Sequence, residues 1–217
     1  VYVRLVWGQL WIVKWIPLSS VIVLANWFPI FLGALAGTFW VRMQKETFLR
    51  RLPIQLLLIA AAVGSEIYVI PAKPPECGNK WIERATLFPW RVCLQTTPDT
   101  CSAAAAATIL TTLDIEANEQ DMATLCLTRR GTTWLGLYHG VSVRLAGTPY
   151  KAEFFECDVE DLDDHIKEHP VLLCCELTDE VATEFPDYEE VDGWIPGVQH
   201  SVVLFARLKT SYFIGDP

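Results

Sequence analysis

Residues 93–104 read Cys-Leu-Gln-Thr-Thr-Pro-Asp-Thr-Cys-Ser-Ala-Ala, and three further alanines follow them. The run from Thr100 to Leu113 is rich in alanine and contains neither glycine nor proline, so it predicts a helix that starts near Asp99 or Thr100. Cys101 then stands at the helix N-terminus, where unpaired backbone amides and the helix dipole favour a thiolate. The stretch therefore predicts a reactive thiol at the beginning of a helix.

The rest of the C-terminal region predicts a small α+β domain. Asn118, with Asp121 three residues later, approximates a capping box and starts a second helix that Gly131 ends. Further helices are expected over 132–145 and 158–169, and strands over 171–177, 200–208 and 211–214. Helices that precede strands in this way indicate helices packed on one side of an antiparallel sheet.

Three other polar residues are placed to serve the thiol of Cys101. Gln95 precedes it by six residues, and a carboxamide beside a nucleophile can hold the oxyanion of a tetrahedral intermediate. His200 opens an apolar strand, and Asp216 follows the next strand sixteen residues later. If these strands form a hairpin, the carboxylate orients the imidazole and the imidazole faces the thiol.

Each of these residues also has a purely structural interpretation. Cys101 can be a half-cystine or a buried helix cysteine, and His200 can simply end a strand. Asp216 can be a turn residue in Gly-Asp-Pro, and Gln95 can bond to a loop backbone. The order and spacing of the four residues favour nucleophilic catalysis over these interpretations.

Gln95 with the Cys101 helix, His200 at the head of a strand, and Gly215-Asp216-Pro217 together resemble the papain-like bacteriocin-processing cysteine peptidase family. The closer likeness is to its stand-alone, membrane-attached bacterial branch, which lacks the transporter's ATPase. The resemblance covers residues 90–217, and the segment 122–133, with Met122-Ala-Thr-Leu-Cys-Leu-Thr and Gly131-Thr-Thr, matches it as well.

This resemblance implies a papain-like domain with a role for each of the four residues. Cys101 becomes the nucleophile and His200 the general base and later acid. Asp216 becomes the residue that orients the imidazole, and Gln95 the oxyanion donor together with the Cys101 amide. Ser102 departs from the family, whose members usually have glycine after the nucleophile.

The leading hypothesis is therefore a cysteine peptidase, a hydrolase that cleaves a peptide or protein substrate and uses no cofactor or metal. Two alternatives stay open: an inactive papain-like domain that binds peptides or senses a signal, and a thiol acyltransferase. The absence of a phosphate loop, a dinucleotide fingerprint and a basic patch argues against nucleotide or nucleic-acid partners. His165 and His169 have zinc-ligand spacing, but no second ligand pair supports them.

The N-terminal third has a different composition from the rest of the 217 residues. Seven basic and two acidic residues give 1–75 a balance of +5, whereas ten basic and twenty-four acidic residues give the remainder −14. Two long apolar runs predict transmembrane helices at about 18–40 and 53–71, within a membrane region over 1–74. Prolines at 71, 74 and 75 then mark the start of the peptidase domain, 75–217.

The loop between the two apolar runs, residues 41–51, has four basic residues and one acid. The positive-inside rule places such a loop in the cytoplasm, so we expect a multi-pass protein of the bacterial inner membrane. The peptidase domain would then face the periplasm or the exterior, with the lipid bilayer as a partner. Seven cysteines leave at least one unpaired, and whether Cys77 and Cys93 form a disulfide stays open, as does what precedes Val1 and follows Pro217.

Overall fold

The structure, a computed structural model, describes residues 11–16, 18–20, 27–43, 48–69, 73–83, 90–167, 169–209 and 211–217. The chain divides into two compact units, residues 1–72 and 73–217. The sequence analysis put the boundary after residue 74, next to the prolines. Each unit is described below by itself.

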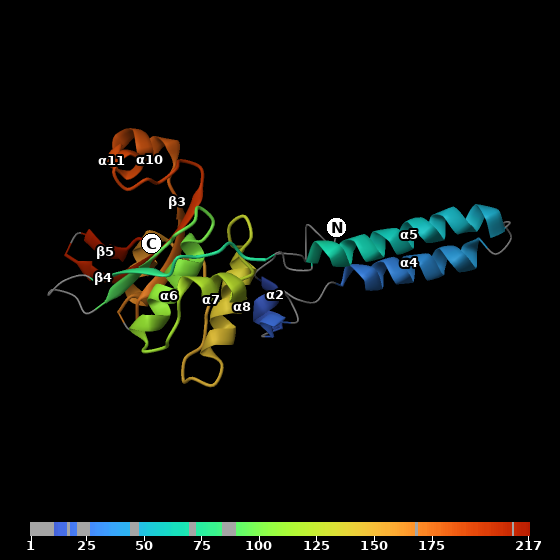
Figure 1. Cartoon of the computed structure of the whole chain (residues 1–217), viewed down its shortest axis with the longest axis horizontal. Coiled ribbons are helices and arrows are strands. Elements are labelled where there is room, and N and C mark those ends of the chain that lie inside the picture. The colour runs from blue at the N-terminus through green and yellow to red at the C-terminus, as the bar shows by residue number, and fades with distance from the viewer. Residues whose placement is uncertain are drawn as a thin grey trace. The chain divides into compact units, whose positions relative to one another are not determined.

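The N-terminal unit consists of helices. They are α2 (Trp11–Trp15), α4 (Phe28–Arg42) and α5 (Phe48–Val69). Figure 1 shows α4 and α5 lying side by side as an antiparallel pair. The Gln55 side-chain amide donates to the Ala36 carbonyl at 3.2 Å, and the Arg51 guanidinium lies 5.7 Å from the centre of the Trp40 ring. These contacts link the two helices along their shared face.

The prediction of two transmembrane helices, at about 18–40 and 53–71, was wrong. Within the described residues, no helix combines the length and the apolar character that crossing a bilayer requires. Helix α4 has 15 residues, a rise of roughly 22 Å against a hydrocarbon core of about 30 Å. Helix α5 has 22 residues, but two arginines, a proline and a glutamine occupy its first eight positions. The apolar stretch 56–64 that follows them spans only about 13 Å.

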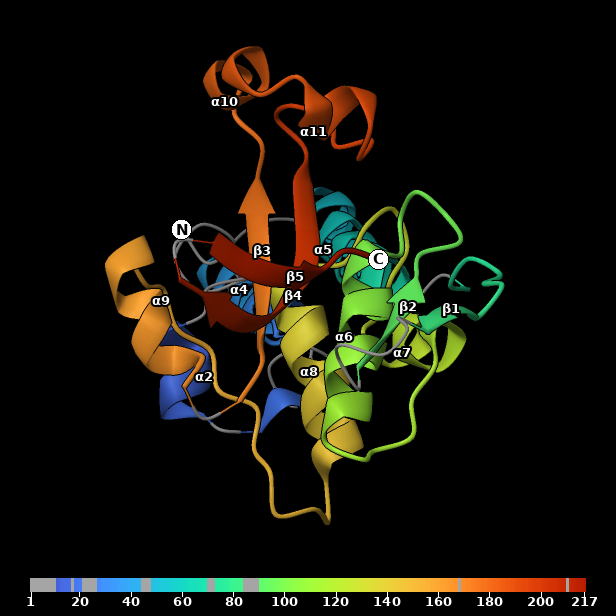
Figure 2. The ribbon, with the colours of Figure 1, turned by 90° about the vertical axis from the view of Figure 1, so that its left-hand side faces the viewer.

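The second unit is α+β with antiparallel sheets, as that part of the fold prediction stated. Its helices are α6 (Cys101–Thr112), α7 (Glu119–Leu125), α8 (Trp134–Leu145), α9 (Val159–His165), α10 (Asp179–Glu184) and α11 (Asp187–Glu190). Strands β1 (Lys80–Glu83) and β2 (Arg91–Leu94) form one pair. Strands β3 (Val171–Glu176), β4 (Gln199–Leu208) and β5 (Ser211–Gly215) form a sheet in that order. Helix α6 packs against β2, β3 and β4 (Figure 2).

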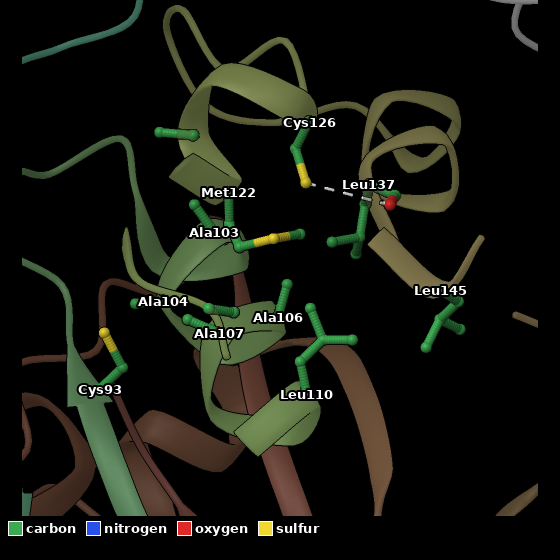
Figure 3. Close-up of a cluster of buried hydrophobic side chains, with 12 residues drawn as sticks. Cys93, Ala103, Ala104, Ala106, Ala107, Leu110, Met122, Cys126, Leu137 and Leu145 are labelled. Carbon is green, nitrogen blue, oxygen red and sulfur yellow. Dashed lines mark hydrogen bonds between the residues drawn. The ribbon is translucent and has the colours of Figure 1, made fainter. Parts of the chain in front are cut away.

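Helix α6 is the centre of the core. All five alanines from Ala103 to Ala107 are fully buried, because only methyl side chains let a helix backbone approach strands and neighbouring helices on several sides at once. Leu110, Met122, Cys126 and Leu137 complete the cluster (Figure 3). The contacts fix the helix axis, and with it the position of Cys101 at the helix start.

A close approach between α7 and α8 depends on a glycine. A Cβ atom at Gly140 would lie 2.4 Å from the Cys126 sulfur and 2.7 Å from the Cys126 backbone nitrogen, distances that real Cβ atoms do not show. Cys126, like Cys77 and Cys93, is a free thiol, so the candidate disulfide between Cys77 and Cys93 is not formed.

Some element boundaries differ from the predictions. The Asn118 side chain caps α7 as expected, because its Oδ1 accepts from the Asp121 amide at 2.8 Å. The helix nevertheless ends at Leu125 instead of Gly131, since Leu127 adopts a left-handed φ of 57° and the Thr128 amide turns back to the Ala123 carbonyl. Strands β1 and β2 and helices α10 and α11 were not predicted.

Candidate active site

Cys101 is the first residue of α6, as the alanine-rich run indicated. The residue before it, Thr100, is the N-cap, and Cys101 itself is partly exposed. Its sulfur lies 3.9 Å from the Ser102 hydroxyl. The thiol therefore stands at a helix N-terminus with solvent access, and both conditions suit a nucleophile.

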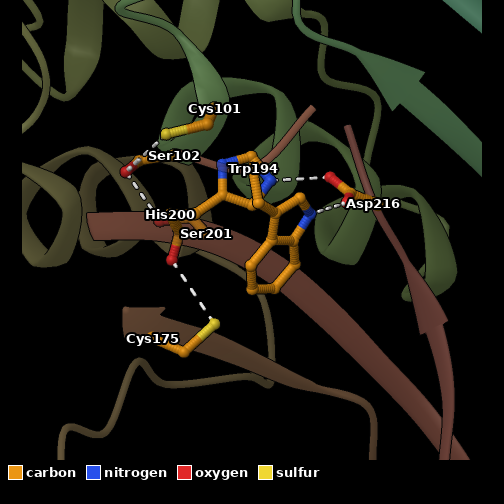
Figure 4. Close-up of polar contacts among 7 residues, drawn as sticks. All are labelled: Cys101, Ser102, Cys175, Trp194, His200, Ser201 and Asp216. Carbon is orange, nitrogen blue, oxygen red and sulfur yellow. Dashed lines mark hydrogen bonds and ion pairs between the residues drawn. The ribbon is translucent and has the colours of Figure 1, made fainter. Parts of the chain in front are cut away.

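His200 and Asp216 come together across the β4–β5 hairpin. His200 is the second residue of β4 and Asp216 directly follows β5, and the His200 Nε2 lies 2.7 Å from the Asp216 Oδ1 (Figure 4). Because Nε2 is engaged by the carboxylate, Nδ1 is the ring nitrogen left for the thiol. The structure thus brings the imidazole between the carboxylate and Cys101.

The pKa values of the thiol and the imidazole shift in opposite directions. Burial favours a raised pKa at Cys101, but its hydrogen bond to His200 and the imidazolium charge lower the pKa overall. Burial favours a lowered pKa at His200, yet Asp216 and Cys101 raise the pKa to about 9. These directions are those of a thiolate–imidazolium pair.

Five other thiols behave in the opposite way. Burial is the largest cause, and it raises the pKa to about 11 or 12 at Cys77, Cys93, Cys126, Cys174 and Cys175. Cys101 is thus distinguished from these buried cysteines by its imidazole partner, not by the helix alone.

Gln95 lies in the loop after β2, next to the chain segment that carries Asp216. Its backbone amide donates to the Pro217 carbonyl at 3.0 Å, so the residue after Asp216 is held in place. The side-chain oxygen of Gln95 is buried and has no hydrogen-bond partner among the described residues. The structure therefore brings Gln95 to the Asp216 side of the site, without a hydrogen bond between the Gln95 side chain and Cys101.

A pair of serines that the sequence analysis did not assign links the two halves of the site. Ser102 and Ser201 are both buried, and their hydroxyl oxygens lie 2.8 Å apart. Ser201 also lies 3.3 Å from the Cys174 sulfur on the neighbouring strand. Ser102, the departure from the family's glycine, thus has a specific partner next to His200.

Trp194 is a second site residue that sequence reasoning missed. Its indole N–H donates to the Asp216 Oδ2 at 2.6 Å, and its ring centre lies 4.9 Å from that of His200. Both carboxylate oxygens of Asp216 are therefore engaged, one by each ring. Trp194 belongs to the segment 177–198 that carries α10 and α11, and its amide donates to the Tyr188 carbonyl at 2.9 Å.

Among the residues that the structure describes, no group of three or more His, Cys, Asp or Glu side chains is arranged to hold a metal ion. His165, half of the pair with zinc-ligand spacing, stacks on Phe155 with ring centres 3.8 Å apart. Comparison of the chain with protein-family models, curated proteins and solved structures found no match.

Proposed function

We propose that this protein is a cysteine peptidase that cleaves peptide bonds with Cys101 as the nucleophile. The observation that carries the proposal is the pairing of Cys101 with His200, which lowers the pKa of that thiol while burial raises the pKa of the five others. A thiolate that is available near neutral pH is what nucleophilic catalysis by cysteine requires.

In the proposed first step, the Cys101 thiolate attacks the peptide carbonyl carbon. A sulfur–carbon bond forms, and the carbonyl oxygen takes the π electron pair as an oxyanion. The Cys101 backbone amide, with the Gln95 carboxamide, stabilises this oxyanion. As the carbon–nitrogen bond breaks, the His200 imidazolium gives its proton to the leaving amine.

The second step hydrolyses the acyl-enzyme. Neutral His200 takes a proton from water, and the resulting nucleophile attacks the thioester carbonyl. Collapse of the intermediate releases the carboxylic acid and restores the thiolate–imidazolium pair. Asp216 holds the imidazole in orientation through both steps, and its engagement by Trp194 limits the rotation of the carboxylate.

The resemblance to bacteriocin-processing peptidases suggests a substrate class as well. We propose peptides cleaved after small residues, with a glycine pair as the first sequence to test. A small side chain on either side of the scissile bond also suits a nucleophile at a helix start, where a bulky residue would contact the helix backbone.

The test is to incubate the full chain with Gly-Gly-containing peptides and identify the products by mass spectrometry, with Cys101→Ala as the control. The expected result is hydrolysis and a trapped acyl group on Cys101, both absent from the control. Added amine acceptor separates hydrolysis from acyl transfer, since a transferase gives an amide product. If no acyl-enzyme forms and Cys101 alkylates with the pH dependence of an ordinary thiol, the peptidase proposal fails.

A further inference from the structure

A fully buried carboxylate lies next to the loop that joins β2 to α6. Glu119, the first residue of α7, is 0% exposed, and among the described residues it is the only buried Asp, Glu, Lys or Arg. No described lysine, arginine or histidine forms an ion pair with it. Because an uncompensated buried charge is strongly destabilising, this carboxylate must be stabilised by hydrogen bonds.

Four hydrogen bonds converge on the two carboxylate oxygens. Oε1 accepts from the Thr96 amide at 2.7 Å and from the Thr100 hydroxyl at 2.7 Å. Oε2 accepts from the Thr96 hydroxyl at 2.7 Å and from the Asn79 amide at 3.3 Å. A carboxylate accepts at both oxygens, so this set of donors suits glutamate.

Three of these four bonds come from the two ends of one short loop. Thr96 directly follows Gln95, and Thr100 directly precedes Cys101. Gln95 and the Cys101 amide are the two groups proposed to hold the oxyanion. One side chain therefore fixes the neighbours of both donors at once.

We infer that Glu119 is a positioning residue that sets the separation between the Gln95 carboxamide and the Cys101 backbone amide for oxyanion binding. This inference rests on the proposed function and adds a residue to it from outside the loop. Glu119 touches no reacting atom. Its effect is confined to steps in which an oxyanion develops.

Glu119→Gln is the most informative substitution because the size of the side chain is kept. Each carboxylate oxygen accepts from one backbone amide, Thr96 at Oε1 and Asn79 at Oε2. Backbone amides only donate, so the glutamine NH₂ group must face a donor whichever way the carboxamide is turned. The loop then loses at least one bond at one of its ends.

The experiment compares two reactions of the same thiol in the full chain. In acylation by p-nitrophenyl acetate, the Cys101 thiolate attacks the acetyl carbonyl, an oxyanion forms, and p-nitrophenolate leaves. In alkylation by iodoacetamide, the thiolate displaces iodide and no oxyanion forms. We expect Glu119→Gln to slow acylation by about 10-fold to 100-fold, in the range of a lost oxyanion donor, and to leave the alkylation rate and its pH profile unchanged.

Two further variants keep the test decisive. If Glu119→Gln does not fold, Thr100→Val removes one bond to Oε1 at constant shape, and Thr100→Ser keeps the hydroxyl and should restore acylation. Thr128→Ala is the matched control, because it deletes a buried hydroxyl, bonded to Thr132 at 2.7 Å, that is not part of the loop 95–101. It should lower stability without a selective loss of acylation.

Three outcomes overturn the inference. Equal losses in both reactions would mean that Glu119 only supports the fold, and no loss in either would mean that the loop keeps its geometry without it. A wild-type chain whose Cys101 alkylates but is never acylated would overturn the proposed function itself, and this inference with it.

Discussion

Ser102 and Ser201 form a hydrogen bond between their buried hydroxyls, 2.8 Å apart. Each residue directly follows a member of the candidate catalytic pair, Ser102 after Cys101 and Ser201 after His200. The bond joins the first turn of α6 to the start of β4, two elements that are a hundred residues apart in sequence. It therefore fixes the nucleophile and the imidazole relative to each other.

Replacing Ser201 with alanine should leave the Ser102 hydroxyl buried without this partner and cost about 1–2 kcal/mol of unfolding free energy. The double variant Ser102→Ala/Ser201→Ala should be destabilised by less than the sum of the two single variants, because neither hydroxyl is then left unpaired. Urea unfolding of the four proteins measures the coupling. Strict additivity would show that the two hydroxyls do not depend on each other.

The reactivity of Cys101 should depend on pH through His200. Since the pKa of Cys101 is lowered and that of His200 is raised to about 9, the ion pair persists between the two values. Hydrolysis should therefore rise with pH as the thiolate forms, and fall as pH rises through about 9, where the imidazolium loses the proton needed by the leaving amine. In His200→Ala, alkylation at pH 7 should slow. A wild-type rate that first rises near pH 9 would contradict the pair.

Labelling should also be selective among the seven cysteines. At pH 7, limiting iodoacetamide should modify Cys101 well before Cys174 and Cys175, whose pKa values burial raises to about 11. The exposed Cys157 is an internal reference for solvent access alone. Peptide mapping by mass spectrometry gives the order of modification, and labelling of Cys101 no faster than that of Cys157 would argue against activation.

Trp194→Phe tests whether Asp216 needs both of its ring partners. Phenylalanine can still contact His200 but cannot donate to the Asp216 Oδ2, and a hydrogen bond to a charged group contributes roughly 1.5–3 kcal/mol. We expect kcat to fall by about tenfold or more with little change in KM, since the carboxylate orients the base and does not touch substrate. Equal kcat in the variant and the wild type would show that the His200 bond alone is sufficient.

Gly140→Ala should destabilise the second unit. The added methyl would overlap the Cys126 sulfur and backbone, and overpacking of this kind costs typically 1–3 kcal/mol. Gly64→Ala in α5 is the matched control, because nothing lies within 4 Å of its added Cβ and alanine favours a helix. Thermal unfolding compares the two, and an unchanged midpoint for Gly140→Ala would mean that α8 shifts without cost.

The sequence was informative where local pattern and function coincide. The alanine run predicted α6 and the place of Cys101, and the two apolar strands predicted the hairpin across which His200 meets Asp216. Both arguments need only propensity and the geometry of neighbouring strands. The charge and hydropathy of the first 75 residues predicted spans that the observed helices do not provide, because apolar composition does not set helix length.

The remaining site residues depend on contacts that no local pattern reports. Trp194 meets Asp216 across 22 residues, Glu119 meets Thr96 across 23, and Ser102 meets Ser201 across 99. An acidic residue in the first turn of a helix is ordinarily exposed, so nothing in the sequence separated Glu119 from the other acids. Its burial follows from how α7 packs beside the loop, which is a tertiary property.

The methyl-only surface of α6 restricts how this protein can diversify. Where a core is built from leucines and valines, substitutions can exchange bulk between neighbours and shift a helix gradually, but Ala103 to Ala107 have no bulk to exchange. A library aimed at new substrate preference should therefore leave 103–107 constant and vary the segment 177–198, which reaches the imidazole through Trp194. Lineages that retain the alanine run can change what they recognise while the nucleophile stays where it is.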